Sequence, residues 1–176
     1  MWKLLKSLFS PQLTSSNSAS SRSASESWGL RGGRPVRTDE VFAAWTSQNL
    51  PRMLSALKLK SNEIDRHFLL MTIVSESYKR RSDPNMAEVC AQVAEMHIEE
   101  FPQIARPLKQ DMGGILPRVS TFQHYATLLT EQSRFDGAIE VCETALRFGL
   151  HDGTKAGFEG RIERIKKKRQ QQRKGN

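Results

Sequence analysis

Four histidines are the first side chains to test for catalysis or metal binding: His67, His97, His124 and His151. A metal site on a helix needs two ligands on one face and a third ligand converging from elsewhere. Only His97 has acidic neighbours, in the segment HIEE, where Glu100 follows three residues later on the same helix face. No further ligand is identifiable near this pair. The sequence therefore favours a surface polar pair and predicts no metal site.

Glycine-containing stretches are the second candidates, because backbone amides in such loops can hold phosphate groups. The segments RGGR and DMGGIL lack the Lys-Ser or Lys-Thr that completes a phosphate-binding loop. In HDGTK, helix capping explains Asp152 and Thr154, and an anion bound at that helix start is the alternative. No set of serine, histidine and acid can be assembled from motifs. We therefore predict that the chain is not an enzyme and uses no cofactor.

The two cysteines, Cys90 and Cys142, lie far apart inside the apolar helical patterns AEVCAQVAEM and AIEVCETAL. Neither belongs to a Cys-x-x-Cys pair, so neither zinc ligation nor a disulfide scaffold is indicated. This cysteine usage is consistent with a reducing compartment. We predict that both thiols are buried as small apolar groups.

The formal net charge of +8 suggests nucleic-acid binding until its distribution along the 176 residues is counted. Residues 1–37 contribute +5 and residues 161–176 contribute +7, so residues 38–160 carry −4. A fold that binds duplex DNA usually carries its basic patch on the folded surface. Because the positive charge is concentrated near the two ends, any polyanion binding is expected to use the tails.

The basic C-terminal run has two interpretations. It is either a solvated extension of the last helix or an arm that binds RNA, DNA or an anionic membrane. The candidate polyanion-binding residues are Lys166, Lys167, Lys168, Arg169, Arg173 and Lys174.

The first nine residues, MWKLLKSLF, are cationic and amphipathic, and the serine-rich stretch over 10–37 is predicted to be a flexible linker. This N-terminal motif could dock into a partner's groove or lie on an anionic membrane. Its candidate docking residues are Trp2, Leu5, Leu8 and Phe9. Alternatively, residues 1–37 have the composition of an organellar transit peptide, or they have no function. The apolar part is too short for a transmembrane segment.

From residue 38 onward, apolar residues recur at helical spacing, and no segment shows the alternation typical of a strand. Pro102 is expected to end one helix and begin a shorter one, and the short break at 133–135 is expected to fold two helices antiparallel. The predicted helices cover about 38–50, 51–57, 62–80, 84–101, 103–112, 120–132, 135–148 and 154–165. The fold class is therefore all-α.

The segment RFDGAIEVCETALRFG carries a repeat-like pattern, in which Phe135 opens a helix and Ala138 and Ala145 occupy packing positions. With Phe122 in the preceding helix, residues 119–152 resemble one tetratricopeptide repeat (TPR), a helix-turn-helix unit of about 34 residues. A weaker match lies 51 residues upstream, with 102–118 inserted between the two hairpins.

This resemblance implies a short α-solenoid of antiparallel helical hairpins with a C-terminal capping helix and a groove that binds a protein segment. The groove positions are Gln123, His124, Thr127 and Glu131 in the clearer repeat, and Thr72, Glu76, Lys79 and Arg80 in the weaker one. The Lys and Asn clamp with which some TPR proteins hold a C-terminal carboxylate is not matched.

The predicted organisation is an N-terminal motif with a disordered linker at 1–37, a TPR-like helical domain at 38–165 and a basic disordered tail at 166–176. The predicted function is a non-enzymatic adaptor or scaffold that binds a protein partner through the groove. The alternative is a nucleic-acid- or ribosome-associated accessory protein acting through its basic tails. A cytoplasmic location is expected, or a mitochondrial one if residues 1–37 are a transit peptide.

Overall fold

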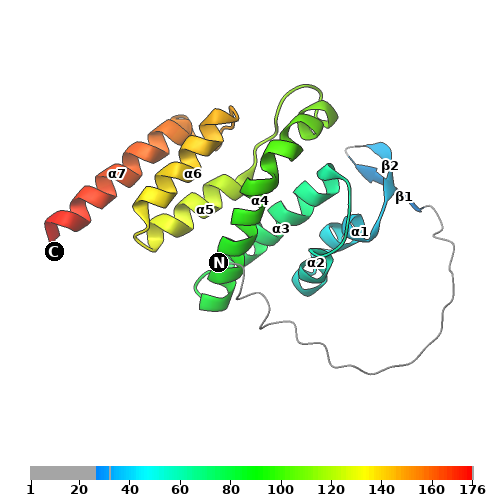
Figure 1. The fold of residues 1–176 in the computed structure, drawn as a ribbon, viewed down its shortest axis with the longest axis horizontal. Coiled ribbons are helices and arrows are strands. Elements are labelled where there is room, and N and C mark those ends of the chain that lie inside the picture. The colour runs from blue at the N-terminus through cyan, green and yellow to red at the C-terminus, as the bar shows by residue number, and fades with distance from the viewer. Residues whose placement is uncertain (1–26, 32, 176) are drawn as a thin grey trace.

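The computed structural model describes residues 27–31 and 33–175, so the candidate docking residues Trp2, Leu5, Leu8 and Phe9 lie outside the described part of the chain. The described residues form a mostly helical fold with one small sheet (Figure 1), which confirms the helical class in its coarse form. The elements are β1 (Ser27–Arg31), β2 (Arg34–Thr38), α1 (Glu40–Thr46), α2 (Leu50–Ala56), α3 (Glu63–Lys79), α4 (Pro84–Asp111), α5 (Ser120–Glu131), α6 (Phe135–Arg147) and α7 (Gly157–Gly175). Within the described part, no helix is long and apolar enough to cross a membrane.

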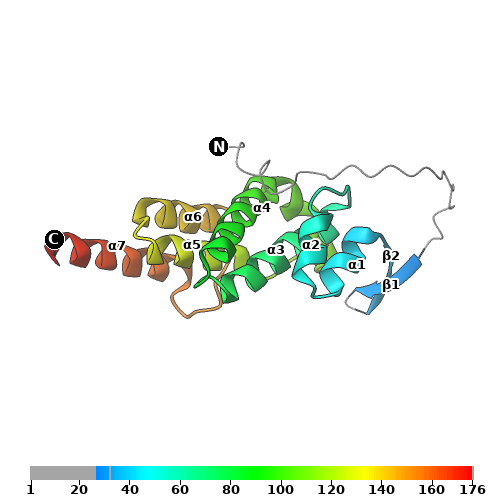
Figure 2. The same cartoon turned by 90° about the horizontal axis from the view of Figure 1, so that it is seen from below.

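The five long helices pack in two layers. Figure 2 shows α4 and α6 above α3, α5 and α7, with the hairpin and the end of α7 at opposite ends of the molecule. Each helix packs on the next along the chain from α3 to α7, and α3 also packs directly on α5. The helices of the lower layer therefore lie side by side.

Aromatic side chains from three helices meet in the core between the layers. Phe101 of α4 contacts Phe122 of α5 with ring centroids 5.3 Å apart, and it contacts Phe148, at the end of α6, at 4.9 Å. Both contacts are edge-to-face, the arrangement that aromatic quadrupoles favour. Phe101 and Phe122 are fully buried, so this contact binds the two layers together.

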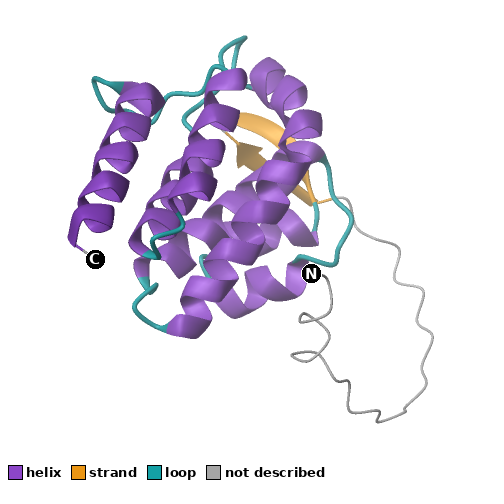
Figure 3. Cartoon of the chain, turned by 60° about the vertical axis from the view of Figure 1, so that its left-hand side comes forward, coloured by secondary structure: helices purple, strands orange, loops and turns teal. Residues whose placement is uncertain are grey.

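The expected linker over 10–37 requires correction at its C-terminal end, because β1 and β2 form an antiparallel hairpin there (Figure 3). Ser27 pairs with Thr38 and Arg31 with Arg34, and Gly33 has φ 80°, a conformation that glycine adopts without steric cost. Strands are predicted from an alternation of buried apolar and exposed polar residues. The hairpin lacks this alternation, since its large apolar side chains, Trp28 and Leu30, are exposed.

The expected helix break at Pro102 is wrong, because α4 runs through both Pro102 and Pro107 to Asp111. A proline inside a helix removes one hydrogen bond and costs about 3 kcal/mol. Here Phe101, Ile104 and Leu108 continue the buried stripe of α4 past the prolines. Burying three such side chains contributes roughly 1.5–3 kcal/mol each, which is comparable to the combined cost of the two prolines.

The disordered tail expected at 166–176 also requires correction, because α7 continues to Gly175. Lys, Arg and Gln are good helix formers, so the basic run extends the helix rather than interrupting it. Phe158, Ile162 and Ile165 bury the first half of α7, and Arg169 pairs with Asp136 of α6 further along.

Candidate functional site

We call the solvent-facing side of the layer formed by α3, α5 and α7 the inner face. On α5 the buried positions are Thr121, Phe122, Tyr125, Ala126, Leu128 and Leu129, so the predicted groove residues of this helix lie on its opposite side. The inner face comprises Thr72, Glu76, Tyr78, Lys79, Arg80 and Arg81 from the α3 side, Arg118 before α5, Gln123, His124, Thr127 and Glu131 on α5, and Arg161, Arg164 and Lys168 on α7.

Two contacts join α3 to α5 across the inner face. The rings of Tyr78 and His124 are stacked, with centroids 4.4 Å apart and planes inclined by 9°. The Arg81 guanidinium lies 4.1 Å from the Tyr78 ring centroid, and its Nε and Nη2 donate to the two Glu131 carboxylate oxygens at 2.7 and 2.9 Å. These paired interactions hold the tyrosine and histidine rings in place.

Thr127 of α5 joins this helix to α7. Its hydroxyl donates to the Gln123 carbonyl oxygen at 2.8 Å and accepts from Arg161 Nη1 of α7 at 3.0 Å. Arg161 also donates twice to Asp152, at 3.1 and 3.0 Å. Burial opposes ionisation of Asp152, but hydrogen bonds from Thr154 and Arg161 lower the pKa of its carboxyl below the ordinary value.

Four cations influence the charge of the His124 imidazole. Burial and then the positive charges of Arg118, Arg161, Arg81 and Lys79 lower its pKa to about 4, so the ring is neutral at pH 7. The Nδ1 atom of His124 is buried and has no hydrogen-bond partner among the described residues. The centre of the inner face is therefore a site of positive potential around a neutral ring.

The predicted groove residues lie on α5 and at the C-terminal half of α3. His124, Thr127 and Glu131 make the contacts described above, and Gln123 accepts a hydrogen bond from Arg118. On α3, Glu76 forms ion pairs with Lys79 and with Arg80, while Thr72 lies one turn before Glu76. The groove residues predicted from sequence did not include Tyr78, Arg81, Arg118, Arg161 or Arg164. The spacing of Arg161, Arg164 and Lys168 along one side of a helix was the signal that could have revealed the contribution of α7.

The candidate polyanion-binding residues do not form a single patch on α7. At 100° per residue, six positions between Lys166 and Lys174 are distributed around the helix, and only Lys168 belongs to the inner face. Lys166 is paired with Glu163, and Arg169 with Asp136.

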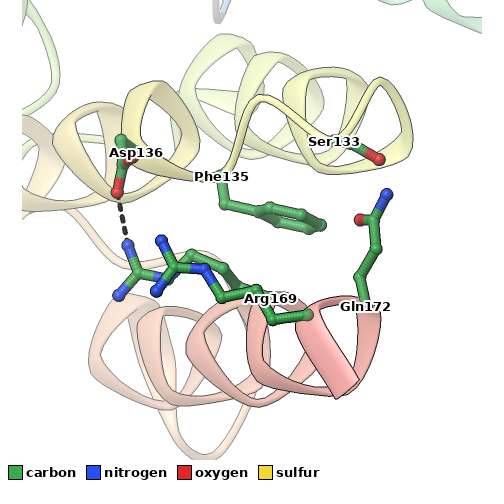
Figure 4. Close-up of a pocket in the computed structure, with 6 residues that line it drawn as sticks. Ser133, Phe135, Asp136, Arg169 and Gln172 are labelled. Atoms are coloured by element: carbon green, nitrogen blue, oxygen red, sulfur yellow. Dashed lines mark hydrogen bonds and ion pairs between the residues drawn. The ribbon is translucent and has the colours of Figure 1, made fainter. Parts of the chain in front are cut away.

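A shallow cavity of about 280 Å³ lies beside the second half of α7 (Figure 4). The ring of Phe135 and the side chains of Ser133 and Asp136 line one side, and Arg169 and Gln172 line the other. Part of the basic run therefore packs against the start of α6.

The expected surface pair of His97 and Glu100 is wrong. His97 is fully buried, and its ring nitrogens lie 2.9 Å from His67 Nδ1 and 2.7 Å from Thr121 Oγ1. Glu100 instead accepts from Arg66 of α3 at 2.7 Å. His67 and His97 are on different helices 30 residues apart, so nothing in the local sequence indicates their contact.

The predicted burial of the two cysteines is confirmed. Cys90 and Cys142 are free thiols with no exposed surface. Burial raises the pKa of the Cys90 thiol to about 11 and that of Cys142 to about 12.

No family model matches the chain, and no solved structure matches it. A relative among the curated proteins is an uncharacterized protein of Aquifex aeolicus (strain VF5), 26% identical over 112 residues. The match covers 64% of this chain and 50% of that protein, so the matched region spans about half the length of the relative.

Proposed function

We propose that the chain is a TPR-like, non-enzymatic interaction module that binds a segment of a protein partner along the inner face. The observation that carries this proposal is that α5 contacts both α3 and α7 on this side: His124 stacks on Tyr78, and Thr127 accepts a hydrogen bond from Arg161. A surface built from three separate helices can contact several consecutive residues of a bound segment.

The inner face is also preorganised. Arg81 is held by Glu131 and Tyr78, and Arg161 is held by Asp152 and Thr127. Side chains that are already fixed lose little conformational entropy when a partner binds, which favours affinity. This arrangement supports the binding of an adaptor to a protein rather than chemistry on a small substrate.

A nucleic-acid- or ribosome-associated role through the basic tails is the competing proposal. It predicts binding that disappears with nuclease treatment and that does not depend on the inner face.

The test is an affinity capture from nuclease-treated lysate with the full chain and two matched tryptophan variants. Thr72→Trp places an indole on the inner face, and Gln92→Trp places one on α4, in the other layer. We expect specific proteins to be captured by the wild type and by Gln92→Trp, and to fall at least about tenfold with Thr72→Trp. Each captured protein is then purified and its direct binding measured. Equal capture and equal direct binding by both variants would refute the proposal.

A further inference from the structure

We propose that the inner face selects an acidic, extended segment of the partner protein, whose carboxylates lie among the cations that surround His124 and continue along α7. This inference rests on the proposed function and specifies the chemistry of its partner. The cations that would contact this segment come from three regions of the sequence: the end of α3, the residues before α5, and α7.

Positive charge is concentrated on the inner face, where cations from the acidic stretch 38–160 lie on the same layer as cations from α7. Residues 38–160 carry a net charge of −4. The inner face nevertheless has seven cationic side chains and, with Asp152 behind Arg161, three carboxylates, a formal excess of four positive charges. The cations are Lys79, Arg80, Arg81, Arg118, Arg161, Arg164 and Lys168.

The other layer shows the opposite charge. A cavity of about 190 Å³ between α4, α5 and α6 is bordered by the carboxylates of Glu95, Glu99 and Glu140. This part of the other layer therefore differs in charge from the inner face. Such a difference orients an acidic partner toward the inner face and away from the outer one.

Not every inner-face cation is free to bind a partner. Arg161 has a side chain only 14% exposed and is fully engaged with Asp152 and Thr127. Lys79 is 67% exposed but is paired with Glu76, whereas Arg164 and Lys168 are exposed and form no ion pair with a described residue. The exposed cations of α7 are therefore the ones available for partner carboxylates.

The cations near His124 disfavour a positive charge on its ring, although Arg81, Arg161 and Lys79 are each paired with a carboxylate. Together with Arg118, they all act on the ring with the same sign. A partner carboxylate placed beside the ring opposes this effect and favours protonation of His124. Binding of an acidic segment should therefore raise the pKa of His124.

The spacing of charges on the inner face favours a peptide over a nucleic acid. Glu131 lies between the α3 and α7 cations with a side chain 40% exposed, and Glu76 lies beside Lys79 and Arg80. The phosphates of a nucleic acid follow one another at short intervals, so some of them would lie next to these carboxylates and be repelled. An extended peptide places alternate side chains on one side about 6.7 Å apart, so its acidic groups can avoid them.

The test uses the full chain and an array of peptides of about 12 residues, with random sequences and net charges from about −6 to +6. The inner-face variant is Arg164→Glu with Lys168→Glu. The control is Arg106→Glu with Lys109→Glu, on the exposed surface of α4. Both double variants change the net charge by the same amount, so any difference between them reports the position of the charges.

We expect binding to increase with the negative charge of the peptide. The inner-face variant should weaken the best acidic peptides by at least about tenfold, and the control by less than about threefold. In histidine NMR titrations, the bound peptide should raise the pKa of His124. Circular dichroism verifies that both variants retain their helices.

Three results would overturn the inference: no dependence on peptide charge, equal weakening by the two double variants, or an unchanged His124 titration. Tighter binding of a single-stranded RNA oligonucleotide, with the same loss in the inner-face variant, would also overturn it. If peptides bind regardless of charge while Thr72→Trp still abolishes partner capture, the acidic selectivity is wrong and the proposed function stands. If Thr72→Trp has no effect on capture, the proposed function itself fails.

Discussion

Arg31, the last residue of β1, donates a hydrogen bond from Nη1 to Oδ1 of the fully buried Asp65 at 3.0 Å. Trp45 Nε1 of α1 donates to the same oxygen at 3.2 Å, and Asn62 Nδ2 donates to the other oxygen at 2.6 Å. One carboxylate of α3 therefore binds the hairpin, α1 and the start of its own helix. The hairpin is part of the folded body because of this contact.

Asp65→Ala should destabilise the protein by about 3–5 kcal/mol, because it leaves Arg31 largely buried without its main partner. Urea unfolding followed by circular dichroism measures the change. The control is Asp111→Ala, since Asp111 lies 3.5 Å from Arg31 and its side chain is 28% exposed. We expect this control to cost less than about 1 kcal/mol. Similar losses in both variants would show that the Asp65 contact is not a central anchor.

The stability of the protein should fall as the pH decreases from 6.5 toward 4. Burial lowers the pKa of His67 to about 4 and holds the pKa of His97 well below its ordinary value. A histidine with a depressed folded-state pKa favours the folded state when neutral, above the unfolded-state value of 6.5. That contribution is lost as the pH falls through this window, because the unfolded chain binds more protons.

For His67 alone, this loss amounts to roughly 3 kcal/mol between pH 6.5 and 4. His67→Asn keeps a polar atom near His97 but removes one titrating ring, so stability should depend less steeply on pH. Chemical unfolding at several pH values measures the slope. His151→Asn, at an exposed position, is the control. A slope that is identical in wild type and His67→Asn would contradict the assignment.

Ala138→Glu should unfold the α5–α6 hairpin, because Ala138 of α6 has no exposed surface and a buried carboxylate costs several kcal/mol. Thermal unfolding and helicity report the loss. The control is Gly137→Ala at the neighbouring position, which should raise stability rather than lower it. A Cβ at Gly137 would lie 3.6 Å from Leu129 Cδ1, an ordinary contact. This change should stabilise the helix by about 0.5–1 kcal/mol. Unchanged melting of Ala138→Glu would be incompatible with the packing of α6.

Both cysteines should be unreactive toward a disulfide reagent in the native protein. Cys90 and Cys142 are buried, and burial keeps their pKa values high, so little thiolate is present at pH 8. In denaturant, both thiols should react completely. A rapid reaction of one equivalent under native conditions would show that one thiol is accessible.

The sequence predicted the helices because their evidence is local. Apolar residues at helical spacing mark α3, α5 and α6, and Cys90 and Cys142 were assigned to the core from their neighbours alone. The groove positions on α5 could likewise be listed, since a helical period separates buried from exposed residues. The TPR-like assignment and the partner stay predictions.

The errors occurred where distant contacts override local preference. Pro102 should end a helix, but the packing of Phe101 and Ile104 on both sides of it keeps α4 continuous. The weak strands at 27–38 are anchored because Arg31 reaches Asp65, 34 residues away.

The sequence by itself therefore determined the helical class, the buried thiols and the solvent-facing side of α5, because these follow from residue type and period. Tertiary structure alone decided the contacts between helices, such as His67 with His97, Tyr78 with His124, and Arg161 with Thr127. Each of these pairs joins residues about 30 to 46 positions apart, a separation over which no periodic pattern carries information. The same packing brings cations from within the acidic stretch 38–160 and cations from α7 onto one layer, because α3, α5 and α7 lie side by side.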